Sequence, residues 1–224
     1  MSQSLASPAR IRVGATALAL AGVLFVLYPA LRPFSDETSM DGAAAFASSL
    51  WIGAHVFAIF GFILTALGSA ALWLALGETR TEPLALRGAA LIALGVALAL
   101  PFYGAEAFAL HAIGQAAMRE NSTTILDISA DVRGGVGLVI FLAGLTVLAV
   151  GAIIVAIAIW HSQLMSRWSG IPFALGLATY IPQFFGAQPI RVAHGVLVAI
   201  GCVWIASGMW RSAGDKLGSD RGFR

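Results

Sequence analysis

Charged residues are scarce in this sequence. They make up 11% of its 224 residues, less than half of the roughly 25% that is typical of soluble domains. Hydrophobic residues make up 59%, and the mean hydropathy is +0.88. This composition excludes an ordinary soluble domain and predicts an all-α, polytopic membrane protein. The net charge of +2 comes without a basic stripe and gives no reason to expect a nucleic-acid partner.

Cysteine and catalytic motifs are nearly absent as well. The single cysteine, Cys202, lies in an apolar run, which excludes a disulfide framework and a cysteine-based metal site. Neither the zinc motif H-E-x-x-H nor the nucleophile motif G-x-S-x-G occurs. Ser48, Ser49 and Ser129 lie near the predicted outer side of the membrane, but nothing places a base beside them. We therefore expect no catalytic residues, and a non-enzymatic role is favoured.

Long apolar runs divide the chain into six predicted membrane spans. Each has close to the roughly 20 residues that a helix needs to cross about 30 Å of hydrocarbon, and the fifth run is the shortest. We therefore predict a polar segment over residues 1–12, a six-helix bundle over 13–210 and a polar tail over 211–224. The predicted spans are residues 13–31, 50–76, 88–113, 134–160, 171–185 and 190–210.

The distribution of Lys and Arg predicts the orientation. With six spans, both termini and the second and fourth loops share one side of the membrane, and that side carries nine of the 13 Lys and Arg residues. Cytoplasmic loops are enriched in these residues. The sequence therefore predicts that both termini are cytoplasmic.

The polar residues inside the spans gather at one depth. Glu106 is the only acidic residue within an apolar span, and a charged side chain at the centre of the bilayer costs roughly 2.5–3.5 kcal/mol. We therefore expect it to face the bundle interior or a water-filled cavity. Successive spans run in opposite directions, which places seven further candidates in the same outer third of the bilayer: His55, Tyr103, His111, Tyr180, Gln183, Arg191 and His194.

Three prolines support an opening at that depth. Pro29, Pro101 and Pro182 lie in the outer halves of the first, third and fifth spans, where each removes a backbone hydrogen bond and bends its helix. Within the third span, Glu106 and His111 are about 140° apart on a regular helix. We expect them to point in different directions unless the helix is loosened near Pro101. The predicted arrangement is a cup that opens outward.

The sequence leaves several interpretations of this polar cluster open. The groups could satisfy one another, with Glu106 paired to Arg191 or to a histidine, and serve only to fix helix register. The favoured functional interpretation is binding, sensing or transport of a small cationic or amphipathic molecule, or of a proton, with Phe102 and Trp51 adding aromatic surface. The alternative is a haem b-binding electron-transfer subunit whose axial ligands are His55 and His194. We predict no other metal site.

Two further patterns concern packing and family. Gly137, Gly144 and Gly151 are seven residues apart in the fourth span, and such a stripe lets another helix approach closely. An oligomer or a partner subunit could pack there.

The segment from Arg167-Trp-Ser-Gly-Ile-Pro172 to Trp204-Ile-Ala-Ser-Gly-Met-Trp210-Arg211 resembles the C-terminal half of a bacterial family of six-helix integral membrane proteins of unknown function. The resemblance implies a bacterial inner-membrane location and assigns no functional residue.

Overall fold

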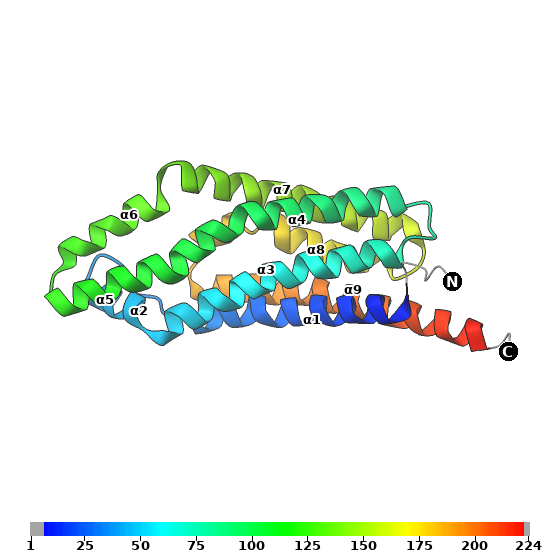
Figure 1. The fold of residues 1–224 in the computed structure, drawn as a ribbon, viewed down its shortest axis with the longest axis horizontal. Helices are drawn as coiled ribbons and strands as arrows, with labels where there is room; N and C mark the ends of the chain where they lie inside the picture. Colours follow the sequence, from blue (N-terminus) through cyan, green and yellow to red (C-terminus); the bar gives the residue numbers. More distant parts are fainter. Residues whose placement is uncertain (1–6, 222–224) are drawn as a thin grey trace.

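The computed structural model describes residues 7–221, with side chains described up to residue 214, and no strand occurs in this part of the chain. The predicted all-α class is therefore confirmed. The elements, shown in Figure 1, are α1 (Pro8–Leu31), α2 (Met40–Ala47), α3 (Ser49–Ala75), α4 (Glu82–Gly104), the π-helical turn η1 (Ala105–Ala109), α5 (Leu110–Glu120), the 3-10 helix η2 (Thr123–Asp127), α6 (Ile128–Arg133), α7 (Gly135–Ser162), the 3-10 helix η3 (Arg167–Ser169), α8 (Gly170–Ala178), the 3-10 helix η4 (Pro182–Phe185) and α9 (Gln188–Arg221).

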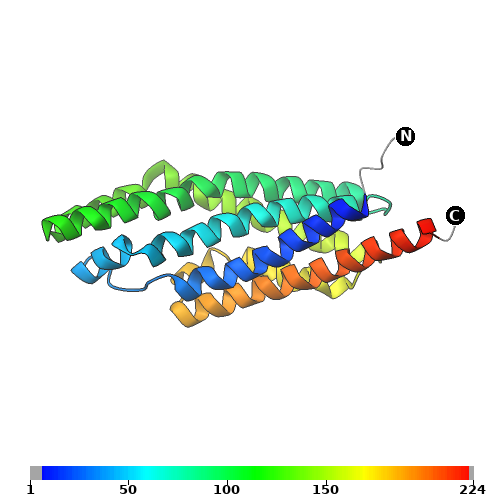
Figure 2. The same cartoon turned by 60° about the horizontal axis from the view of Figure 1, so that its bottom comes forward.

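Six helices pack side by side in a closed ring. Helix α1 lies between α3 and α9, α4 lies between α3 and α7, and α8 lies between α7 and α9. Buried Ala, Leu and Phe side chains from these helices form one continuous core. The first and last helices run alongside each other, and their free ends lie at the same end of the bundle (Figures 1 and 2). We call the opposite end the distal end.

Five helices of the described chain are long and apolar enough to cross a membrane: α1, α3, α7, α9 and the helix formed by α4, η1 and α5 together. The chain is thus a multi-pass membrane protein by length and composition. The predicted fifth span, 171–185, differs from the prediction. It forms the nine-residue helix α8, a turn over residues 179–181 and η4, because Pro182 has no N–H to continue the helical hydrogen bonds. The predicted count of six spans is not confirmed.

The distal end carries an extension that the spans alone do not predict. Helix α4 continues through η1 into α5 as one helix of 39 residues, about 58 Å long and nearly twice the thickness of the hydrocarbon layer. Its distal part packs against α2 and η2. A second, smaller core holds these elements together, and its buried members are Ala43, Phe46, Trp51, Leu110, Ala117 and Leu126.

Several predicted loops and tails are helical. The polar segment 32–49 contains α2, and the loop 115–133 contains the end of α5, η2 and α6. The tail predicted over 211–224 continues as helix α9 to Arg221, and the predicted polar segment 1–12 contains the start of α1 at Pro8. Residues 1–6 and 222–224 of those two predictions lie outside the described residues.

The glycine stripe of α7 packs within the chain. The backbones of α4 and α7 approach so closely that a Cβ atom added to Gly144 would lie 2.9 Å from the carbonyl oxygen of Gly95, and one added to Gly151 would lie 2.9 Å from that of Gly88. Gly137 has nothing within 4 Å of such an atom. Two of the three glycines proposed to contact a partner are therefore occupied by α4, and a partner at Gly137 stays a prediction.

Candidate functional site

The π-helical turn η1 sets the position of Glu106. It follows Pro101 and Gly104 in the same continuous helix, and π-helical turns are frequent at functional sites. The turn is fixed from outside, because the indole Nε1 of Trp51 donates a hydrogen bond of 2.7 Å to the carbonyl oxygen of Glu106. Trp51 is fully buried. The side chain of Glu106 is therefore held on the inner side of the helix, as the sequence predicted.

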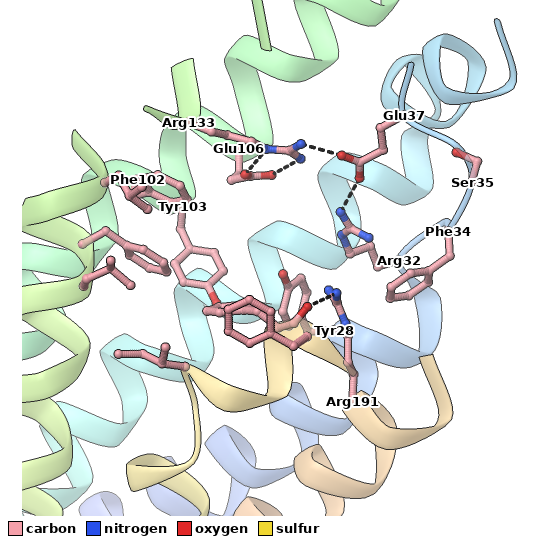
Figure 3. A pocket seen from close by; sticks show the side chains of 16 residues that line it. Tyr28, Arg32, Phe34, Ser35, Glu37, Phe102, Tyr103, Glu106, Arg133 and Arg191 are labelled. Carbon is pink, nitrogen blue, oxygen red and sulfur yellow. Dashed lines mark hydrogen bonds and ion pairs between the residues drawn. The ribbon is translucent and has the colours of Figure 1, made fainter. Parts of the chain in front are cut away.

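Four charged side chains form a continuous row across the distal end, which we call the ionic row: Arg32, Glu37, Arg133 and Glu106. Arg133 at the end of α6 binds the Glu106 carboxylate twice, from Nε at 2.6 Å and from Nη2 at 3.0 Å. Its Nη1 also binds Glu37, which accepts a hydrogen bond of 2.8 Å from Arg32. Figure 3 shows the row running from η1 to the end of α1. Three separate segments are thereby tied together.

Mutual pairing stabilises the charged forms of the ionic row. Burial raises the pKa of Glu37, but its hydrogen bonds and charge interactions with Arg133 and Arg32 outweigh that effect and bring the pKa below its usual 4.5. Burial likewise lowers the pKa of Arg133, and its contacts with Glu106 and Glu37 more than reverse this and raise it. Both groups are therefore charged at neutral pH.

Aromatic side chains pack beneath the ionic row. The hydroxyls of Tyr103 and Tyr180 lie 3.1 Å apart in a hydrogen bond, and the Tyr28 ring meets the Tyr103 ring edge-on at 5.9 Å. Phe62 packs against Tyr103 and Tyr180 with ring centroids 5.2 Å away from each. These side chains are buried, and they close the bundle below the distal end.

A cavity of about 600 Å³ opens between the ionic row and this aromatic layer. Its size is that of small-molecule sites, which are typically about 300–1,000 Å³. In Figure 3, Glu106 and Arg133 lie on one side, Arg191 on the other, and Phe102 and Tyr103 form a wall between them. The lining residues are Tyr28, Arg32, Phe34, Ser35, Glu37, Phe102, Tyr103, Glu106, Arg133, Leu138, Phe141, Leu142, Ile181, Phe184, Phe185 and Arg191.

Three of the eight predicted site residues line this cavity: Tyr103, Glu106 and Arg191. Three others, Tyr180, Gln183 and His194, surround a separate void of about 10 Å³ next to Arg191, which has room for one water molecule at most. The polar cluster is thus divided between the cavity and the packing beneath it.

The two candidate haem ligands do not fit a shared cofactor site. His55 is buried against Trp51, with Nδ1 bonded to the Trp51 carbonyl oxygen at 2.7 Å and Nε2 3.6 Å from a Glu106 oxygen. The Nε2 atom of His194 is already bonded to the carbonyl oxygen of Gly176 at 2.7 Å. Neither histidine lines the 600 Å³ cavity. No group of three or more His, Cys, Asp or Glu side chains in the described chain could hold a metal ion.

His111 points away from the cavity. Its Nδ1 bonds the carbonyl oxygen of Phe46 at 2.8 Å, and its Nε2 lies 3.0 Å from Gln115. It therefore fastens α2 to α5. Glu106 and His111 therefore have different contacts, and His111 belongs to the distal extension.

Among the cavity residues that the sequence missed, three are charged: Arg32, Glu37 and Arg133. All three lie in segments predicted to be loops, where charged side chains are normally solvated. The sequence proposed Arg191 or a histidine as partner of Glu106. His55 does lie 3.6 Å from the carboxylate, but the hydrogen-bonded partner is Arg133. The available signal was the position of Arg133 directly before the apolar run that begins at residue 134.

In comparisons with protein-family models, curated proteins and solved structures, nothing matched this chain. The resemblance to a bacterial six-helix family therefore stays a prediction, and the site must be interpreted from its own chemistry.

The lowered pKa of Glu37 makes stability dependent on pH. In the unfolded chain Glu37 takes up a proton near pH 4.5, whereas in the folded protein it does so only at lower pH. The ionised Glu37 therefore contributes fully to the free energy of unfolding above about pH 4.5. This contribution is lost as the pH falls through the pKa of Glu37 in the folded protein. We expect the melting temperature of the detergent-purified protein to fall in this range, and to fall less steeply in Glu37→Gln. The control is Glu120→Gln, at an exposed carboxylate at the end of α5. Equal slopes in both variants would contradict the assignment.

Proposed function

We propose that the chain crosses a bacterial inner membrane six times, with both termini in the cytoplasm and the distal end facing outward. The excess of Lys and Arg on the side of the termini supports this orientation. The first and last helices have their free ends at the same end of the bundle, which requires an even number of crossings. Because α8 lies in the ring between α7 and α9, we assign the sixth crossing to α8 and η4. In this orientation the cavity opens at the outer face.

We further propose that the protein binds a small molecule in this cavity and acts as a receptor, sensor or transport component. The observation that carries the proposal is the cavity itself, where paired charges on one side face aromatic side chains on the other. Ligand sites combine apolar walls with a few convergent polar groups in this way. Haem binding is not favoured, because His55 and His194 are engaged elsewhere.

Filling the cavity tests this function. Leu142 lines the cavity, so Leu142→Trp should reduce its volume, and native mass spectrometry should detect a small molecule that copurifies with the wild-type protein and is lost from this variant. The matched control is Leu67→Trp, because Leu67 is 57% exposed on the apolar surface of α3. The same bound masses in all three proteins would contradict binding in the cavity.

A further inference from the structure

The cavity has an excess of positive charge. Three arginines line it against two glutamates: Arg32, Arg133 and Arg191 against Glu37 and Glu106. The glutamates are both engaged by the ionic row. A cationic ligand, one of the classes expected from the sequence, would have no unengaged carboxylate to bind.

Arg191 is the one arginine lining the cavity that does not belong to the ionic row. It donates from Nε to the carbonyl oxygen of Gly186 at 2.9 Å and from Nη2 to that of Phe184 at 2.5 Å. Among the side chains that the structure describes, no carboxylate forms an ion pair with it. A guanidinium has five N–H donors, so these two bonds leave three of them unused, and Arg191 lines the cavity. Two carbonyl bonds also hold the group in place, which lowers the entropy lost when it binds an anion.

The wall between Arg191 and the ionic row is lined by packed aromatic rings. The Phe102 and Phe141 rings stack with centroids 4.2 Å apart, and Phe141 meets Phe184 at 5.9 Å. Two further lining residues reach the molecular surface, since Phe185 is 89% exposed and Leu138 is 37% exposed. Both lie in apolar segments of the bundle. The apolar side of the cavity therefore continues to exposed apolar side chains on the outside of the bundle.

We propose that the cavity binds a single-chain anionic amphiphile, a carboxylate or phosphate on a hydrocarbon chain. The anionic group binds Arg191, and the chain lies along Phe102, Phe141 and Phe184 and leaves toward the bilayer beside Phe185. The inference rests on the proposed function, because it names the ligand class of the same cavity. Free fatty acids and single-chain phospholipids both have this chemistry.

Headgroup competition tests the proposal. The detergent-purified full chain is mixed with palmitate, hexadecanol or hexadecyltrimethylammonium, which share a sixteen-carbon chain, and adducts are quantified by native mass spectrometry. A charge-assisted hydrogen bond contributes about 1.5–3 kcal/mol, so palmitate should bind about tenfold or more tightly than hexadecanol. Palmitoyl lysophosphatidate, added as a fourth probe, separates the two sources: the tighter of the two anions identifies a fatty acid or a membrane lipid.

Substitutions at Arg191 complete the test. Arg191→Gln should remove the preference for palmitate over hexadecanol, and Arg191→Lys should keep part of it because the charge remains. Arg119→Gln, at an exposed arginine at the end of α5, should leave the preference unchanged.

The outcomes separate the two proposals. Equal binding of all headgroups, or a palmitate preference that persists in Arg191→Gln, overturns the anionic amphiphile while binding stays sensitive to Leu142→Trp. If no probe binds, the anionic amphiphile is overturned, and the copurified masses of the wild-type and Leu142→Trp proteins decide the proposed function. If Leu142→Trp alters none of the binding, both the proposed function and this inference fail.

Discussion

Arg133→Ala is expected to lower the free energy of unfolding by about 3 kcal/mol, the lower end of the range for removing one partner from a buried ion pair. The lower end applies because the Arg133 side chain is 27% exposed. The substitution leaves the Glu106 carboxylate, 13% exposed, without its two hydrogen bonds from Arg133, and it separates α6 from η1. Unfolding of the detergent-purified protein by heat or denaturant measures the effect.

Two further variants distinguish the ion pair from general loss of charge. Arg133→Lys keeps the charge but cannot form both hydrogen bonds to Glu106 at once, and should fall between the wild type and Arg133→Ala. The double substitution of Arg133 and Glu106 by Met should be more stable than Arg133→Ala, because no unpaired charge stays buried. Arg119→Ala is the matched control. If it costs as much as Arg133→Ala, the ionic row does not stabilise the distal end.

Gly95→Leu is expected to disrupt the contact between α4 and α7 severely. A Cβ atom at this position would lie 2.5 Å from the backbone nitrogen of Leu148 and 2.6 Å from the carbonyl oxygen of Gly144. Backbone atoms in packed helices cannot move aside cheaply, and overpacking costs about 1–3 kcal/mol or more. We expect a sharp loss of monodisperse protein on size-exclusion chromatography and a lower melting temperature.

Gly137→Leu is the control for this prediction. Gly137 lies in α7, seven residues before the Gly144 that contacts Gly95, yet nothing lies within 4 Å of its added Cβ atom. The substitution should leave the yield and melting temperature near those of the wild type. Equal losses at Gly95 and Gly137 would indicate that the damage comes from helix propensity or insertion, not from the contact between α4 and α7.

Two signals in the sequence made much of the architecture predictable: the hydropathy of the runs and the depth of the polar residues within the predicted spans. Apolar runs gave the ring-forming segments, because lipid-facing and core-facing positions are both apolar in a membrane helix. Antiparallel order brought Tyr103, Glu106 and Arg191 to one cavity. Proline was a poorer guide to where helices end. Helix α8 ends shortly before Pro182, whereas Pro29 and Pro101 lie within helices that continue past them.

The ionic row was not predictable from the same signals. Arg32, Glu37 and Arg133 lie outside the apolar runs, and their meeting depends on how α2 and α6 fold back over the distal end. The π-helical turn also left no clear pattern, because it depends on the hydrogen bond from Trp51, which is 55 residues away in the sequence. Glu106 was correctly predicted to face inward, and the Nε2 atom of His55 lies 3.6 Å from its carboxylate, but its hydrogen-bonded partner Arg133 was not predicted.

Labelling of Leu142→Cys in intact cells tests the central claim, an outward-facing ligand cavity, most directly. The native Cys202 is fully buried, so reaction with a membrane-impermeant methanethiosulfonate reports the introduced thiol. We predict labelling from outside that palmitate slows, whereas Arg167→Cys, at η3, reacts only after the cells are permeabilised. Labelling of Arg167→Cys in intact cells, or no labelling of Leu142→Cys in intact cells, would contradict the account.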